Sequence, residues 1–193
     1  MAMGMGAYEW REWRFEAGRV CLDLVAAAPE RPELLAGWLK GSGLLPPGTP
    51  LDAVAVSWIP SFRELRDCVA RLVHAELEGR TDDGALVRLN RLAAEAAPPA
   101  PRAVRGDDGT LVRAPLDPPR RDELLAAVAR DAVELLTDPV TRAGLRRCEG
   151  DNCPRVYVDT SRGRRRRWCS SEVCGNRERV ARHRRRAGTR RSG

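Results

Sequence analysis

Apolar residues recur three and four positions apart along several stretches of this chain, a spacing that predicts helices. The clearest stretch is Ser61–Leu77, with Phe62, Leu65, Val69, Leu72, Val73 and Leu77 as its apolar set. Ser61 and Glu64 have the spacing of a capping box at its start. Similar patterns predict helices over Pro32–Leu39, from Leu51–Trp58, after Asp82 or Asp83, over Arg120–Thr137 and briefly from Pro139.

Strand patterns are fewer and shorter. Glu9–Leu24 alternates loosely between apolar and polar residues and predicts one or two short strands. Asp108-Gly109 is a strong turn sequence and predicts a hairpin over Arg102–Ala114. The predicted fold class is therefore mainly α with a small β-hairpin component (α+β): a helical N-terminal domain followed by a small C-terminal module.

Four of the six cysteines form two evenly spaced pairs, Cys148-x4-Cys153 and Cys169-x4-Cys174. Four thiolates about 2.3 Å from a Zn²⁺ ion make a closed structural site with no position for water. So few apolar residues surround these pairs that one structural zinc ion is expected to supply most of the local stability. The alternative is four cysteines that are evenly spaced by chance, free or in disulfides.

The predicted module has three parts: a knuckle-like turn at each cysteine pair, a hairpin between them and a helix after them. Val156–Val158 is expected to form one strand, Ser161–Gly163 the turn and Arg166–Trp168 the antiparallel return strand. Gly175–Arg186 contains no helix breaker and is expected to be helical, with Val180 packed toward the knuckle.

Charge is distributed very unevenly along the 193 residues. The whole chain has a net charge of +7, with 34 basic and 27 acidic residues. Residues 148–193 hold 14 arginines against 5 acidic residues, whereas residues 1–147 hold 20 basic and 22 acidic residues. This asymmetry indicates a polyanionic partner for the C-terminal module. Apolar runs are too short to span a membrane, and residues 1–7 do not resemble a secretory signal, so a cytoplasmic location is expected.

Four short sequences occur in order within the module: Cys148-Glu149-Gly150-x-x-Cys153, Asp159-Thr160-Ser161, Arg166-Arg167-Trp168-Cys169 and Cys174-Gly175-Asn176-Arg177. With them the module resembles the CGNR zinc-finger family, and the upstream region resembles the ABATE-type domain that precedes such fingers. Gly18-x4-Asp23 is similar to the opening motif of that domain, although Leu24–Ala27 replaces its usual aromatic and Asn-Thr.

The resemblance implies a bacterial, stress-responsive transcription regulator. We expect the protein to be associated with the nucleoid. Its expected parts are an ABATE-type mainly helical domain at residues 8–144, a CGNR-type zinc finger at 145–187 and a disordered basic tail at 188–193. The N-terminal domain is expected to form a homodimer or to sense a small-molecule effector. No catalytic motif is recognisable in the sequence, so we do not expect an enzyme.

DNA is the expected partner, with RNA, a ribosome or an acidic protein as alternatives and no membrane partner. The candidate nucleic-acid-binding residues are Arg164, Arg165, Arg166, Arg167, Asn176, Arg177, Arg179, Arg182, Arg184, Arg185 and Arg186. Asn176 either braces the knuckle or contacts a base, and the sequence leaves both open. For Trp168 we favour a place in the small core of the module, and the alternative is an exposed platform on which a base stacks. For His183 we expect a solvated or phosphate-contacting side chain.

Overall fold

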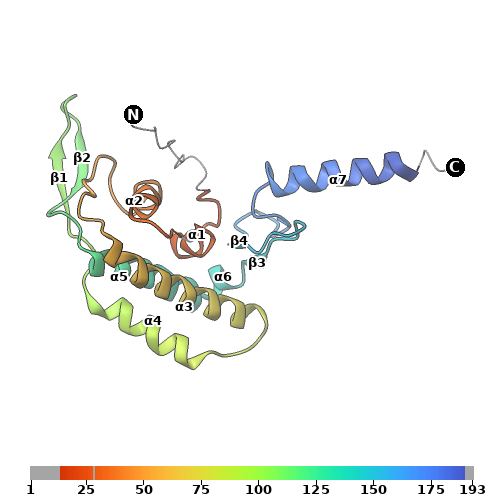
Figure 1. Ribbon diagram of the computed structural model, residues 1–193, viewed down its shortest axis with the longest axis horizontal. Helices are drawn as coiled ribbons and strands as arrows, with labels where there is room; N and C mark the ends of the chain where they lie inside the picture. The colour runs from red at the N-terminus through yellow and green to blue at the C-terminus, as the bar shows by residue number, and fades with distance from the viewer. Residues whose placement is uncertain (1–13, 28, 190–193) are drawn as a thin grey trace, which may run out of the picture.

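The computed structural model describes residues 14–27 and 29–189, with side chains as far as residue 184 (Figure 1). Its helices are α1 Val20–Ala27, α2 Pro32–Gly41, α3 Ile59–Leu77, α4 Asp83–Glu95, α5 Arg121–Thr137, α6 Pro139–Arg142 and α7 Cys174–Thr189. Its strands are β1 Pro101–Arg105, β2 Leu111–Pro115, β3 Leu145–Arg147 and β4 Val156–Val158. Two antiparallel pairs, β1–β2 and β3–β4, accompany a mainly helical structure, which confirms the predicted α+β class.

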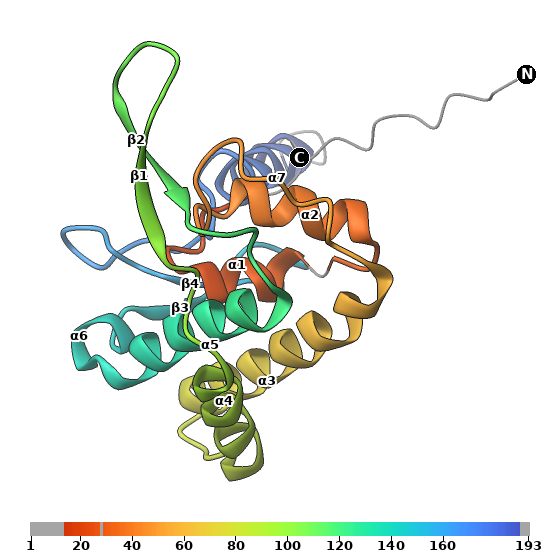
Figure 2. The same cartoon turned by 90° about the vertical axis from the view of Figure 1, so that its left-hand side faces the viewer.

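Helices α3 and α5 lie side by side at the centre of the N-terminal region (Figures 1 and 2). Helix α4 packs on one side of this pair and α1 on the other. The fully buried side chains of this region include Trp38 of α2, whose ring meets Phe62 of α3 edge-on at a centroid distance of 6.5 Å. Burial of these apolar side chains is the main stabilising contribution to this part of the fold.

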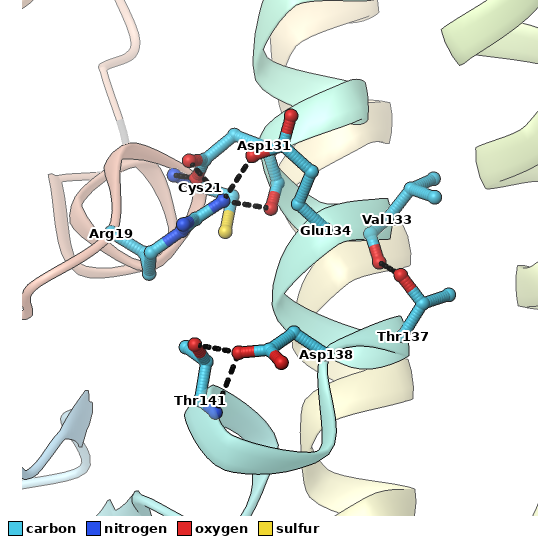
Figure 3. A network of polar contacts seen from close by, with 8 residues as sticks. All are labelled: Arg19, Cys21, Asp131, Val133, Glu134, Thr137, Asp138 and Thr141. Carbon is cyan, nitrogen blue, oxygen red and sulfur yellow. Dashed lines mark hydrogen bonds and ion pairs between the residues drawn. The ribbon is translucent and has the colours of Figure 1, made fainter.

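Polar contacts attach the start of α1 to α5 (Figure 3). The amide of Cys21 donates a hydrogen bond to Asp131 Oδ2 at 2.9 Å. The Arg19 guanidinium forms ion pairs of 2.9 Å with both Asp131 and Glu134. These contacts fix the short segment that precedes α1, which is the segment that meets the C-terminal module.

The predicted strands over Glu9–Leu24 are wrong within the described residues. Residues 20–24 belong to α1, residues 14–19 contain no strand, and the part before residue 14 lies outside the described residues. Cys21, Leu22, Asp23 and Leu24 are all buried, so this short helix is enclosed on several sides. A short enclosed helix lacks an amphipathic pattern, and for that reason its sequence is easily mistaken for a strand.

The predicted helix from Leu51–Trp58 is also wrong, because only Val56–Trp58 form a turn of 3-10 helix. Helix α3 instead begins at Ile59 and takes Pro60 into its first turn. Proline is tolerated there because the first helical amides have no intrahelical acceptor. The N-cap is therefore Trp58, which makes no side-chain capping bond, and the capping box predicted at Ser61 and Glu64 is absent.

Other predicted elements are confirmed with small changes in their bounds. Asp82 caps α4 by accepting a hydrogen bond from the Ala85 amide at 3.0 Å. The hairpin β1–β2 turns at Asp108-Gly109, where Gly109 has a φ of +79°. Helix α2 begins at Pro32, and Asp138 caps α6 through the Val140 and Thr141 amides. No helix among the described residues has the length and apolarity needed to cross a membrane.

Pairing in the C-terminal module differs from the prediction. Strand β4 pairs with β3, in a register that places Leu145 opposite Val158, and not with Arg166–Trp168. The knuckle between Cys148 and Cys153 thus serves as the turn of the hairpin. Residues Arg166–Trp168 form no regular strand. A hydrogen bond of 2.9 Å from the Glu149 amide to the Arg167 carbonyl attaches this segment to the knuckle.

Candidate metal centre and nucleic-acid interface

The four cysteines of the two pairs come together at one point. Cys148 follows β3, Cys153 ends the knuckle, Cys169 lies in the loop and Cys174 begins α7. Their sulfur atoms all lie within 4.8 Å of one another. The Cys169 sulfur is 3.7 Å from both the Cys153 and the Cys174 sulfur.

These separations fit a metal and not a disulfide. In a tetrahedral site with Zn–S bonds of about 2.3 Å, neighbouring sulfur atoms are about 3.8 Å apart. A disulfide would need about 2.05 Å. All four cysteines are free thiols, consistent with one structural zinc ion held by Cys148, Cys153, Cys169 and Cys174.

Backbone geometry supports this cluster. A Cβ at Gly150 would lie 3.1 Å from Cys174 Cβ, a tight contact that glycine avoids where the knuckle approaches the sulfur atoms. Asn152 has a φ of +58°, a left-handed conformation that asparagine tolerates better than most residues. The amides of Cys169 and Gly150 point at the Cys148 sulfur, at 3.3 and 3.5 Å.

Ionisation of all four thiols would require a bound cation. Burial raises the pKa of the Cys174 thiol to about 11 and that of Cys169 further still. Burial also opposes ionisation of Cys148, yet the amides of Cys169 and Gly150 leave its pKa below the usual value. A cluster in which one thiol ionises readily and others resist becomes a set of four thiolates only when a bound divalent cation offsets their charge.

The module is docked against the start of the N-terminal region. The Val158 amide donates to the Ala17 carbonyl at 2.8 Å, and the Ala17 amide donates to Asp23 Oδ1 at 3.1 Å. Gly18 between them has a φ of +83°, and a Cβ there would lie 3.4 Å from the Val158 oxygen. The motif Gly18-x4-Asp23 therefore shapes the contact with β4, a role that the sequence analysis left unassigned.

The predicted nucleic-acid-binding arginines differ in their contacts within the protein, and Arg166 belongs to the fold. Its guanidinium donates to the carbonyls of Trp168 at 2.8 Å, Glu16 at 3.2 Å and Cys169. It also lies 4.7 Å from the centre of the Tyr157 ring. We therefore assign Arg166 a structural role, because its Nε and Nη2 donors bind carbonyls inside the protein.

Three more arginines of the predicted set make contacts within the protein while remaining exposed. Arg167 forms an ion pair with Glu149 at 2.6 Å and lies 5.3 Å from the Trp168 ring centre. Arg164 donates to the Val140 carbonyl at 3.1 Å, and Arg179 to the Ser171 carbonyl at 3.3 Å. Sequence reasoning missed this division because adjacent arginines have the same local pattern.

Helix α7 carries most of the exposed residues of the predicted set. It leaves the metal cluster at Cys174 and projects away from the helical region (Figure 1). Exposed residues of the predicted set on this helix are Asn176, Arg177, Arg179, Arg182 and Arg184, and Arg165 is exposed on the preceding loop. The side chains of Arg185 and Arg186 lie outside the described residues. The helix continues to Thr189, so Gly188 and Thr189 are not the disordered tail that the sequence predicted, and residues 190–193 are not described.

Two further residues of the module have their environments settled by the structure. Trp168 is half-buried and packs against the core, with a Cβ placed on Gly175 only 3.4 Å from its ring. This agrees with the core role and not with an exposed stacking platform. Val180 is 43% exposed, which corrects the prediction that it packs on the knuckle: α7 has left the module by that residue.

Family models match almost the whole described chain. One, described as "Putative stress-induced transcription regulator" and named ABATE, matches residues 18–139. The chain belongs to the ABATE family. A second model, the CGNR zinc finger, matches residues 145–187 and includes all four clustered cysteines. This ABATE protein thus joins a helical region to a zinc finger, as its sequence suggested. No curated protein matches it closely.

Proposed function

We propose that this protein is a DNA-binding transcription regulator in which zinc holds the finger and α7 contacts the duplex. One observation carries the proposal: α7 begins at a zinc ligand and then projects into solvent with exposed arginines. Anchoring at Cys174 fixes the direction of a helix that has little apolar surface of its own. Three arginines of this helix remain available to a polyanion: Arg177, Arg182 and Arg184. Among the described residues, none of the three makes internal hydrogen bonds like those of Arg166.

Duplex DNA fits this helix better than RNA does. Helix α7 has 16 residues, or about 24 Å of axis, and the major groove of B-DNA is wide enough to admit a helix. The major groove of A-form RNA is too narrow and deep for side chains to read, and single-stranded RNA is bound largely by stacking on aromatic rings. Helix α7 contains no aromatic residue other than His183, Tyr157 is fully buried and Trp168 is half-buried.

The expected interaction is mainly electrostatic. Each phosphate neutralised on B-DNA contributes about −0.9 to the slope of log K against log salt concentration. Three exposed arginines of α7 on phosphates would give a slope of roughly −3. Binding should therefore be strong at low salt and fall steeply as salt is added.

Fluorescence anisotropy of the zinc-loaded full chain tests the proposal, with a labelled DNA duplex, a structured RNA hairpin and an acidic polypeptide as probes. We expect preference for the duplex and a loss of affinity in Arg182→Ser/Arg184→Ser. The matched control is Arg102→Ser/Arg113→Ser, which removes the same charge from the exposed hairpin β1–β2. No binding to the duplex at low salt would refute the proposal, and preference for RNA or the acidic polypeptide would replace it with one of the alternatives.

The remaining expectations for this protein stay predictions. Dimerisation or effector sensing by the helical region would place regulation there, and light scattering of the zinc-loaded protein tests the first of these. We propose no catalytic activity for either region. Residence in the cytoplasm on the nucleoid follows from the DNA-binding proposal and is tested by fluorescence microscopy of a tagged chain.

A further inference from the structure

Helix α7 carries three exposed residues other than arginine that lie along one line on its surface. Asn176, Val180 and His183 are spaced four and three residues apart, so they fall within about 60° of one another around the helix. All three are exposed, and Val180 is 43% exposed. We call Asn176, Val180 and His183 the central stripe.

Arginines border the central stripe on both sides. Arg177 and Arg184 lie along one side, while Arg179 lies along the other and Arg182 further round. A helix that only attracted a polyanion would gain from arginine at any exposed position. Here the middle of the basic surface holds an amide, an aliphatic and an imidazole side chain instead.

Packing does not explain the stripe. Val180 is not among the partly buried apolar residues that contact the core of the described structure. It lies six residues beyond the zinc ligand Cys174, where α7 already projects from the finger (Figure 1). A partner that offers both negative charge and a small apolar contact would complement an exposed valine with guanidinium groups on both sides.

The major groove of DNA offers both. Asparagine forms paired hydrogen bonds with adenine N6 and N7, and aliphatic groups contact the thymine methyl group. Asn176 and Val180 are separated by about 6 Å along the helix axis, which is close to two base-pair steps of about 3.4 Å. Side chains at this spacing can therefore reach base pairs two steps apart while the bordering arginines contact phosphates on the two strands.

We propose that the central stripe reads base sequence in the major groove, with Asn176 on adenine, Val180 on a thymine methyl group and His183 donating to guanine. This inference rests on the proposed DNA binding and adds its specificity. The arginines then supply most of the affinity, and the stripe supplies the preference for A·T-containing sites. A protein partner would need acidic side chains opposite the arginines on both sides of this valine, and the acidic polypeptide probe of the anisotropy experiment tests that alternative.

Selection from a library of randomised duplexes, using the zinc-loaded full chain, provides the test. The wild-type protein should enrich a site containing an A·T step. Asn176→Ala should lose discrimination at the adenine position by about tenfold. The control Arg182→Ser should weaken binding to all duplexes alike while the enriched sequence stays the same.

A second arm isolates Val180 by changing the DNA alone. Replacing the selected thymine by deoxyuridine removes only the methyl group, and it should weaken wild-type binding by a few fold. Val180→Ser should be insensitive to that replacement. Zinc content and helical circular dichroism of both variants should equal those of the wild type, which shows that neither change acts through the fold.

The outcomes separate this inference from the proposed function. Absence of duplex binding would refute both. Duplex binding with no enriched sequence, or with a sequence unchanged in Asn176→Ala and Val180→Ser, would overturn the reading role alone. Loss of zinc from Asn176→Ala would show that Asn176 braces the knuckle and would remove it from the stripe.

Discussion

Arg166 tests the division between arginines that hold the fold and arginines that face solvent. Arg166→Ala removes the guanidinium that joins three carbonyls, those of Trp168, Cys169 and Glu16. It also removes the cation that lies 4.7 Å from the Tyr157 ring centre. Because Glu16 precedes α1 and Trp168 precedes a zinc ligand, the loss loosens the finger from the helical region.

The size of the effect follows from these contacts. Hydrogen bonds from a charged donor contribute about 1.5–3 kcal/mol each, and a cation–π contact about 0.5–2 kcal/mol. Arg166 is only half-buried, so we take the lower end of each range and discount for solvent, which gives about 4 kcal/mol in total. For a chain of this size that corresponds to a fall in Tm of about 10 °C.

Thermal unfolding of the zinc-loaded protein, followed by circular dichroism, measures the change, and a chromogenic chelator follows zinc release in parallel. Arg166→Lys should show an intermediate loss, because a lysine ammonium keeps the charge but cannot reach all three carbonyls. Arg182→Ala is the matched control on α7, where the exposed side chain should change Tm by about 1 °C or less. For DNA binding at low temperature the order should reverse, with Arg182→Ala the more damaging change.

An Arg166→Ala protein with wild-type Tm and wild-type zinc retention would refute this reasoning. It would mean that the three carbonyls are satisfied equally well by water. Equal loss of DNA affinity in Arg166→Ala and Arg182→Ala, with both proteins stable, would show instead that Arg166 contacts DNA directly.

Three further substitutions test other parts of the structure. Burial raises the pKa of the Asp23 carboxyl group to about 6 from its usual 3.8. The native state therefore binds the carboxyl proton more tightly than the unfolded chain, and the free energy of unfolding falls as pH rises from about 4 to 6. Asp23→Asn should remove that fall, so that by pH 7 its free energy of unfolding in urea exceeds that of the wild type by about 2–3 kcal/mol. The same pH dependence of unfolding in both proteins would contradict this prediction. Gly18→Ala should cost about 1–2 kcal/mol through its positive φ, and because that strain falls next to the Ala17–Val158 hydrogen bond it should speed zinc release. Gly43→Ala, with a φ of +75° and nothing within 4 Å, should leave zinc release unchanged, and equal release rates would count against the docking role. Cys169→Ser should bind zinc far more weakly than the wild type in competition with a chelator, and retention of wild-type zinc affinity would exclude Cys169 as a ligand.

Features set by neighbouring residues could be predicted from the sequence. Asp82 caps α4 because a short carboxylate directly before a helix can reach its first amides. Asp108-Gly109 forms the hairpin turn because glycine accepts positive φ. The cysteine spacing predicted the sulfur cluster because ligand chemistry and the turn at Gly150 are both local.

Features set by tertiary position could not be predicted in the same way. Arg165 and Arg166 are adjacent and identical, yet one is exposed and the other is bonded to three carbonyls across the module. Leu145–Arg147 shows no strand alternation, and it pairs with β4 only because the knuckle reverses the chain beside it. The sequence likewise gives no sign that α1 is enclosed, since burial on several sides erases the helical period.

Reversible removal of zinc while DNA binding is followed tests the central claim most directly. The claim is that the four thiols orient α7 and that oriented arginines bind the duplex. Anisotropy with a labelled duplex should show binding by the zinc-loaded protein, a large loss after chelation and recovery when one equivalent of zinc is restored. Duplex affinity and salt dependence that remain unchanged without zinc would show that the arginines act without the folded finger, and would contradict the account.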